Sequence, residues 1–363
     1  MSLFRIEMLP AERGDCIWIE YGDPRDPNRL LIDGGTNATY KAIRKRLRDV
    51  KDNKPNFELL IITHVDSDHI GGILKLITDS NTKFSLDEIW FNGYKHLSGF
   101  EEFGPIQGEK LTTFLWERPE WNKHFGALRV AVPEDGSLLT VPLRGGMNLT
   151  ILSPGVDQLR KLQPIWSKEC RKAGLDPAVK PPKPQPAPPA GFEAFGLLDA
   201  EFDVEALANV PSEADKSEAN GSSIAVLAEF EGRRVLLAGD AHPVVLLTSI
   251  RKLVGIGGEK DSRLRLDAFK LPHHGSRFNV SRELLESVNC QRYLFSTDGT
   301  GGFNHPDREA VARVIKFGGQ NPELIFNYRT EFNSIWDKPH MAKQYGYTVA
   351  FSPTNKTGQT IEL

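Results

Sequence analysis

Apolar residues recur along this chain with two different periods, which together predict a mixed α/β protein. Residues 3–8 alternate as in a half-buried strand, and the runs at 16–21 and 30–33 predict two more strands joined by a hairpin turn at 22–28. The run at 57–62 is apolar except for Glu58, which is typical of a buried strand. Residues 39–50 and 73–77 instead carry apolar side chains at helical spacing.

The pattern continues, stops and then resumes. Strand-like segments lie at 88–92, 128–132, 138–141 and 149–152, and a helical one at 109–117. Residues 156–219 have little strand character, and 180–189 form a polyproline-like run. Strands resume at 224–230, 234–238, 266–271 and 292–296, with helices at 243–253 and 307–317. We therefore divide the chain into a first half (1–155), an insertion with a proline-rich linker (156–219), a second half (220–318) and a C-terminal extension (319–363).

The sequence pattern assigns no catalytic residues to the insertion or to the C-terminal extension. The insertion is expected to be a partly disordered spacer, although a proline-binding partner is an alternative. In the extension, the apolar runs at 325–328 and 347–351 suggest an added hairpin or a surface for a protein partner.

Composition and charge narrow the class of protein. The formal net charge of the 363 residues is −3, so a nucleic-acid substrate would need a local basic cluster. The predicted helix at 39–50 has one, although a solvated helix face is the preferred interpretation; its members are Lys41, Arg44, Lys45, Arg46 and Arg48. No membrane span or signal peptide is visible, and the three cysteines favour a reducing cytoplasm. We therefore expect a cytoplasmic protein without a membrane partner.

One stretch concentrates metal-ligating residues. His64, Asp66, Asp68 and His69 follow the buried run at 57–62, and Gly71 and Gly72 come directly after them. Strands of α/β sheets present such residues at their C-terminal ends. Imidazole and carboxylate groups at this density suit a divalent ion such as zinc, manganese or iron. The alternative is an acidic loop that caps a helix.

Further candidates follow other strands. Asp240 ends the strand at 234–238 after a glycine, and the segment Pro272-His273-His274-Gly275-Ser276 ends the strand at 266–271. Asp240 could instead cap the next helix. His96 could reach a metal from a strand end, but we expect a surface residue. Asp33 either supports a ligand histidine from behind or caps a turn.

These motifs resemble the His-x-His-x-Asp-His signature of metallo-β-lactamase-fold hydrolases, with Asp66 in place of the second histidine. The variant resembles the hydrolase domain of ComEC-type competence DNA-uptake proteins and their free-standing relatives. The resemblance spans roughly residues 3–316 and omits the proline-rich run and the tail. It implies an αββα sandwich, the metallo-β-lactamase fold, with the site at one edge of two sheets.

The resemblance also implies site roles. His64 and Asp66 would hold one metal; Asp68, His69 and either His273 or His274 would hold the other, with His273 favoured, and Asp240 would bridge. Relatives supply one more histidine from the loop that is Asn220-Gly221-Ser222-Ser223 here, so the first site should be oxygen-rich and favour manganese over zinc. The catalytic candidates are Asp68, Asp240 and His305, and the substrate-binding candidates are Asn220, Ser222, Ser276, Asn304 and His305.

The expected protein is a metal-dependent hydrolase with one or two zinc or manganese ions. By resemblance it is a phosphodiesterase or nuclease, with nucleic acid or a nucleotide as substrate. His305, in Asn304-His305-Pro306, would contact a phosphate or protonate a leaving group, or else mark only a helix-start turn. Two other functions stay open. One is a carboxylic-ester, lactone or thioester hydrolase, and the other is a noncatalytic partner protein that acts through the insertion or the extension.

Overall fold

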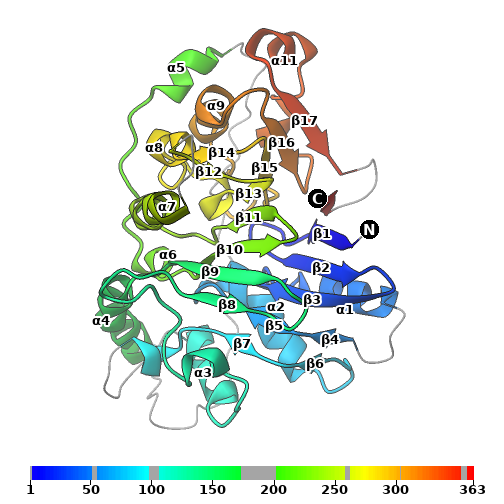
Figure 1. Cartoon of the computed structure of the whole chain (residues 1–363), viewed down its shortest axis with the longest axis vertical. Coiled ribbons are helices and arrows are strands. Elements are labelled where there is room, and N and C mark those ends of the chain that lie inside the picture. The colour runs from blue at the N-terminus through cyan, green and yellow to red at the C-terminus, as the bar shows by residue number, and fades with distance from the viewer. Residues whose placement is uncertain are drawn as a thin grey trace.

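Two β-sheets lie face to face with helices on both outer sides (Figure 1). The computed structural model describes residues 2–50, 55–97, 106–172, 202–257, 262–302, 304–352 and 358–363. The first sheet has the order β18 (Gln359–Glu362), β1 (Leu3–Met8), β2 (Ile17–Asp23), β3 (Asp26–Ile32), β5 (Leu59–Ile61), β7 (Ile89–Trp90). The second has the order β17 (Thr348–Phe351), β16 (Glu323–Phe326), β15 (Arg292–Phe295), β13 (Ala268–Lys270), β11 (Arg233–Leu237), β10 (Ala225–Phe230), β9 (Asn148–Ser153), β8 (Thr140–Pro142).

Alternation along the strands explains why the sheets stack. In β2, Ile17 and Ile19 belong to the core between the sheets, whereas Trp18 belongs to the core under the helices of the first sheet. In β10, Val226 points to the same central core and Leu227 to the opposite side. Because both faces of each sheet are apolar, each sheet needs one partner sheet and one helical layer. The αββα sandwich predicted from the sequence is confirmed.

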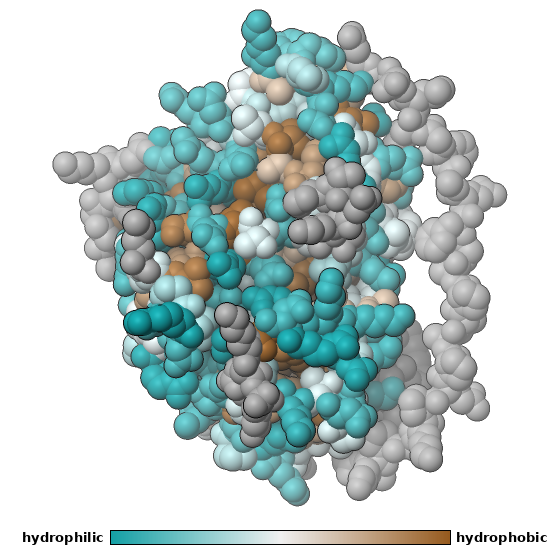
Figure 2. Space-filling model, turned by 90° about the vertical axis from the view of Figure 1, so that its right-hand side faces the viewer, coloured by the Kyte–Doolittle hydropathy of each residue, from teal (hydrophilic) through white to brown (hydrophobic). Residues whose placement is uncertain are grey.

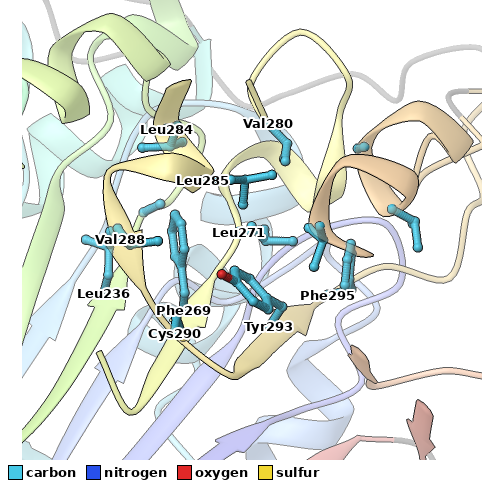
Figure 3. Packing of buried hydrophobic residues seen from close by; sticks show 14 of the residues in the cluster. Leu236, Phe269, Leu271, Val280, Leu284, Leu285, Val288, Cys290, Tyr293 and Phe295 are labelled. Carbon is cyan, nitrogen blue, oxygen red and sulfur yellow. The ribbon is translucent and has the colours of Figure 1, made fainter. Parts of the chain in front are cut away.

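The helical layers hold the two outer cores. Over the first sheet lie α1 (Tyr40–Asp49), α2 (Ser67–Thr78), α3 (Ile106–Leu115) and α4 (Val156–Lys172); over the second lie α5 (Val204–Ala208), α7 (Pro243–Gly257), α8 (Arg282–Glu286) and α9 (Arg308–Phe317). Figure 3 shows part of the second core, where Leu284 and Leu285 of α8 meet Phe269 and Leu271 from the region of β13. The short α6 (Glu218–Gly221) leads into β10, and α10 (Glu331–Ser334) and α11 (Pro339–Tyr345) connect β16 to β17.

Smaller elements complete the chain. Two pairs of short strands lie outside the main sheets: β4 (Asn56–Phe57) with β6 (Ser85–Leu86), and β12 (Leu264–Arg265) with β14 (Val288–Asn289). Single turns of 3-10 helix are η1 (Tyr94–His96) and η2 (Lys123–Phe125), whereas η3 (Pro272–Gly275) is a tight turn that contains two left-handed residues. None of the helices within the described ranges combines the length and apolar composition that a membrane crossing requires.

Two local predictions are wrong. Residues 128–132 form no strand; Val132 makes one isolated bridge to Gly155. The C-terminal runs form no hairpin, because β16 and β17 pair in parallel and extend the second sheet. β18 instead pairs with β1 in the first sheet.

The segment predicted as an insertion begins with regular structure. Residues 156–172 form α4, and its Leu159 and Trp166 are buried in the core of the first sheet. The proline-rich run at 180–189 lies outside the described residues.

Candidate metal centre

Both sheets deliver polar residues to one edge of the sandwich. Asp33 follows β3, and His64 follows β5, while Asp240 follows β11, and His274 follows β13. The paired strands β3 and β5 are parallel, as are β11 and β13, so their C-terminal ends meet there. The signature spans a loop and the start of a helix: α2 begins at Ser67, so Asp68 and His69 lie in its first turn.

Each of three buried histidines has its Nδ1 atom occupied. The Nδ1–H of His69 donates to Asp33 Oδ2 at 2.8 Å, and that of His274 donates to the Ser296 carbonyl at 2.9 Å. The Thr63 hydroxyl donates to Asp33 at 2.7 Å, so its oxygen can accept from His64 Nδ1 at 3.0 Å. A histidine with a protonated Nδ1 keeps its lone pair on Nε2.

The three Nε2 atoms converge on one carboxylate. Asp240 Oδ2 lies 3.8 Å from Nε2 of His64, 3.3 Å from that of His69 and 3.6 Å from that of His274. The Nε2 atoms of His69 and His274 are 3.3 Å apart. The four residues are at most 3% exposed, so water screens these interactions weakly.

A divalent metal ion fits this arrangement. Among the described residues, the buried atoms His64 Nε2 and Asp240 Oδ1 have no hydrogen-bond partner, which is costly unless something cationic joins them. Burial alone would raise the pKa of Asp240, but the surrounding imidazoles hold it well below its usual range, so the group stays a carboxylate. Burial would likewise lower the pKa of His69, but Asp240 and Asp33 raise it well above its usual range. The raised pKa means that His69 holds a proton on its ring, and a bound metal ion would take the place of that proton.

One potential ligand group matches a predicted site: Asp68, His69 and His274 have ligand atoms within 4.8 Å of one another. A second group departs from the prediction, because His64 lies with His69 and Asp240 rather than with Asp66. Asp66 lies outside these groups: its Oδ2 is 3.7 Å from His64 Nε2, and its side chain is 45% exposed at the rim. The part of the centre near His64 can therefore take an additional oxygen ligand from the rim, such as the Asp66 carboxylate.

The preference for His273 as the ligand is not supported by the geometry, which favours His274. Both residues have left-handed backbone, with φ of 47° and 56°, and this conformation directs their consecutive side chains differently. The Nδ1 of His273 lies 2.9 Å from Asn279 Oδ1, and its Nε2 stays 4.0 Å from Asp240 Oδ2. Burial would lower the pKa of His273, but Asp240 and a hydrogen bond to Asp215 raise it to about 9. His273 lines the mouth of the centre.

The other predicted substrate residues divide into two groups. His305 is near the centre, with its ring 5.2 Å from that of His273, and burial and the neighbouring histidines lower its pKa to about 3. Asn220 is also near, since its amide donates to Asp215 at 2.7 Å and lies 3.4 Å from His273 Nδ1. Ser222 and Ser276 make local bonds, to Ala219 and Phe278 respectively. Asn304 is exposed.

His96 belongs elsewhere. Its Nδ1 accepts from the Gly93 backbone N–H at 3.1 Å, and its Nε2 lies 3.2 Å from the Ala127 carbonyl. Both ring nitrogens are therefore used by the backbone, and the side chain is buried rather than on the surface as expected. Of the two roles considered for Asp33, support of a ligand histidine agrees with its hydrogen bonds to His69 and Thr63.

Sequence reasoning missed a buried ion pair behind His274. Lys270 Nζ donates to Asp15 Oδ2 at 2.7 Å, and Asp15 Oδ1 lies 3.4 Å from His274 Nδ1. Burial would raise the pKa of Asp15, but the Lys270 ammonium keeps it well below its usual value. The signal was present, because Gly14-Asp15 stands directly before β2 at the edge where the other ligands gather.

Three more residues near the centre were missed. Ser223 Oγ accepts from the Asp240 backbone N–H at 3.2 Å and lies 3.1 Å from His64 Nδ1. Asp215 accepts from Asn279 at 2.9 Å and so fixes the surroundings of His273. Arg13 Nε lies 3.9 Å from Asp68 Oδ2, and its side chain is 36% exposed. No sequence motif identifies these three residues, because the partner of each lies far away in the sequence.

A two-sheet sandwich with a histidine and aspartate centre at one edge defines a class of metallohydrolase. The chain belongs to the metallo-beta-lactamase superfamily, whose family model matches residues 10–291. This membership supports a metal-dependent hydrolase in general terms. Among curated proteins, none matches the chain significantly.

One similar solved structure is the metallo-beta-lactamase fold protein YhfI from Bacillus subtilis. The two chains share 11% identity, with 99% of this chain and 100% of that chain covered, at a TM-score of 0.41.

Proposed function

We propose that this protein is a metal-dependent phosphodiesterase that cleaves a nucleic acid or a nucleotide. The observation that supports the proposal is Arg13, a partly exposed cation at the rim of the centre, beside Asp68. Among the described residues its ion pair with Asp68 is its only one, and at 3.9 Å that pair leaves donors for another anion. A guanidinium binds phosphate oxygens with paired hydrogen bonds, whereas a neutral carboxylic ester offers it no charge to bind.

The residues of the centre would divide the work as follows. His64, His69, His274 and Asp240 would hold the metal from below, and Asp66 and Asp68 from the rim. When bound, the metal would lower the pKa of a water molecule and stabilise charge on the phosphoryl oxygens. Arg13 would orient a nonbridging oxygen of the diester. His273 and His305, whose rings are 5.2 Å apart, would hydrogen-bond the substrate.

The ligand set also bears on metal identity. Asp66 and Asn220 stand where relatives carry histidines, so the part of the centre near His64 is poor in nitrogen. Hard oxygen ligands favour manganese relative to zinc. The protein should therefore work better with manganese than with zinc.

A substrate panel tests the proposal. Bis(p-nitrophenyl) phosphate, single-stranded DNA, RNA, a cyclic nucleotide and p-nitrophenyl acetate are each tested with manganese, zinc and magnesium. Hydrolysis of the diesters is expected, with the largest rate for manganese. Activity on the acetate alone, or no bound metal and no activity, would contradict the proposal.

A matched pair of arginine variants makes the test specific. Arg13→Gln should lower kcat/KM for the diester by roughly 10²-fold, the usual cost of one lost oxyanion donor, and leave metal content unchanged. Arg25→Gln removes a surface arginine whose side chain is 90% exposed, and should change neither. Equal activity of the two variants on the diester would remove Arg13 from the proposal.

A further inference from the structure

Helix α1 carries an exposed row of positive charge. Its inner face packs through Ile43 and Leu47. Lys41, Arg44, Lys45 and Arg48 are exposed, and we call these four residues the α1 stripe. Figure 2 shows the side of the molecule on which α1 lies, and hydrophilic residues cover most of it.

Arg46, the remaining basic residue of the helix, does not belong to the stripe. Its guanidinium donates to Glu7 at 2.7 Å, lies 3.0 Å from Glu20 and stacks 4.7 Å from the centre of the Trp18 ring. The charge of Arg46 is therefore paired within the fold, unlike the charges of the four stripe residues.

The stripe residues repel one another. Their spacing of i, i+3, i+4 and i+7 places them on one face over roughly 10 Å of helix. Pairs of like charge at this spacing destabilise a helix. The first turn of α1 has no acidic residue, and no ion pair joins the stripe to any carboxylate in the described ranges. The fold leaves this repulsion uncompensated, and an external polyanion would relieve it.

The stripe begins beside the metal centre. The segment that leads into α1 touches the loop of Arg13, because the Thr36 hydroxyl donates to the Glu12 carboxylate. It also packs on α2 just past His69: a Cβ at Gly71 would lie only 2.7 Å from the Asn37 backbone nitrogen. Asp33, which supports His69, precedes the same segment. Arg13 and the first turn of α1 therefore lie on the same edge of the sandwich.

We propose that the α1 stripe binds the phosphate backbone of a single nucleic-acid strand whose scissile diester lies at the metal centre. This inference rests on the proposed function. Charge complementarity identifies the occupant, since the protein is acidic overall and concentrates unpaired cations here. A single strand fits better than a duplex, because the ligand atoms of the centre are buried and one strand reaches them more closely.

The test compares two variants with the same change in net charge. The stripe variant carries Lys41→Gln, Arg44→Gln, Lys45→Gln and Arg48→Gln; glutamine keeps helix propensity and removes the repulsion, so the helix should persist. The control variant replaces four exposed basic residues on separate elements by glutamine, namely Lys161, Arg251, Arg265 and Lys343. Both are made in the full chain, with and without Asp240→Asn to prevent cleavage during binding.

Binding of a single-stranded 20-mer is measured by fluorescence anisotropy between 50 and 200 mM salt. Each phosphate contact contributes about 0.7 to the slope of log affinity against log salt, so four contacts contribute roughly 3. The wild type and the control should therefore lose roughly 50-fold more affinity over this salt range than the stripe variant. A stripe variant with the slope of the control would overturn the inference.

Small substrates separate this inference from the proposed function. Bis(p-nitrophenyl) phosphate is too short to reach the stripe, so its hydrolysis should be equal in the wild type and the stripe variant, while KM for the 20-mer rises. If the wild type hydrolyses no diester with any metal, the proposed function fails, and the anisotropy measurement still tests the stripe. If the stripe variant loses more affinity for duplex than for the single strand, the assignment of a single strand is overturned.

Discussion

Two buried histidines show how the same side chain serves opposite purposes in this protein. His69 and His96 are both almost inaccessible to solvent. The pKa of His69 is raised well above its usual value by Asp240 and Asp33, whereas burial lowers the pKa of His96 to about 3. His96 has backbone partners on both nitrogens, while the Nε2 of His69 faces a carboxylate and another imidazole. The difference teaches that burial alone does not identify a metal ligand. A ring nitrogen that is not hydrogen-bonded to the backbone does.

The strongest test of this comparison is the loss of the carboxylate on which the histidines converge. Asp240→Asn keeps the shape but removes the charge, so metal content should fall and activity should drop by more than the 10–100-fold typical of residues behind a ligand. Metal analysis and kinetics measure this, and circular dichroism checks the fold. Asp267→Asn, in the same half of the chain and ion-paired to Arg233, is the control. Normal metal content in Asp240→Asn would contradict the assignment.

The adjacent histidines offer a second test. His274→Gln should lower the number of metal ions bound per chain, because its Nε2 faces Asp240 and His69. His273→Gln should keep the metal and lower turnover, because its Nδ1 is held by Asn279. Metal stoichiometry distinguishes the two, and the opposite order would restore the preference for His273.

Asp33 tests the support behind a ligand. Asp33→Asn weakens the hydrogen bond that orients His69, and metal affinity should fall by roughly 10–100-fold. Calorimetric titration measures the affinity, and thermal unfolding of the metal-free protein reports any loss of stability, since Asp33 also binds Thr63. An unchanged affinity would mean that His69 needs no orientation from Asp33.

The smallest effect concerns His96. Its pKa is about 3 in the folded protein and near 6.5 when unfolded, so the unfolded chain binds a proton first as the pH falls. Stability is retained above pH 6.5 and decreases below it by up to about 1.4 kcal/mol per pH unit. Denaturant unfolding at pH 7 and pH 5 should show a larger loss in the wild type than in His96→Gln. An equal loss of unfolding free energy in the wild type and in His96→Gln would mean that His96 is in contact with water.

The sequence predicted those site residues that directly follow an apolar strand, because strand and ligand are neighbours along the chain. The apolar run before His64, the turn at Asp240 and the motif at His273 and His274 mark strand ends directly. Sequence could not decide between His273 and His274, because the left-handed backbone of η3 determines which ring points inward. It also missed the pair of Asp15 and Lys270, whose partners come from different sheets. Such contacts exist only after the sheets pack.

The pairing of β18 with β1 has a consequence for synthesis of the protein. Arg5 leaves the ribosome long before its partner Glu362, which lies 357 positions further along the chain. Until Gln359–Glu362 emerges, β1 presents an unpaired edge with Ile6 and Met8 beside it. An open edge of this kind invites pairing with other chains. Nascent chains stalled before β18 should therefore aggregate more readily than chains from which β18 has emerged.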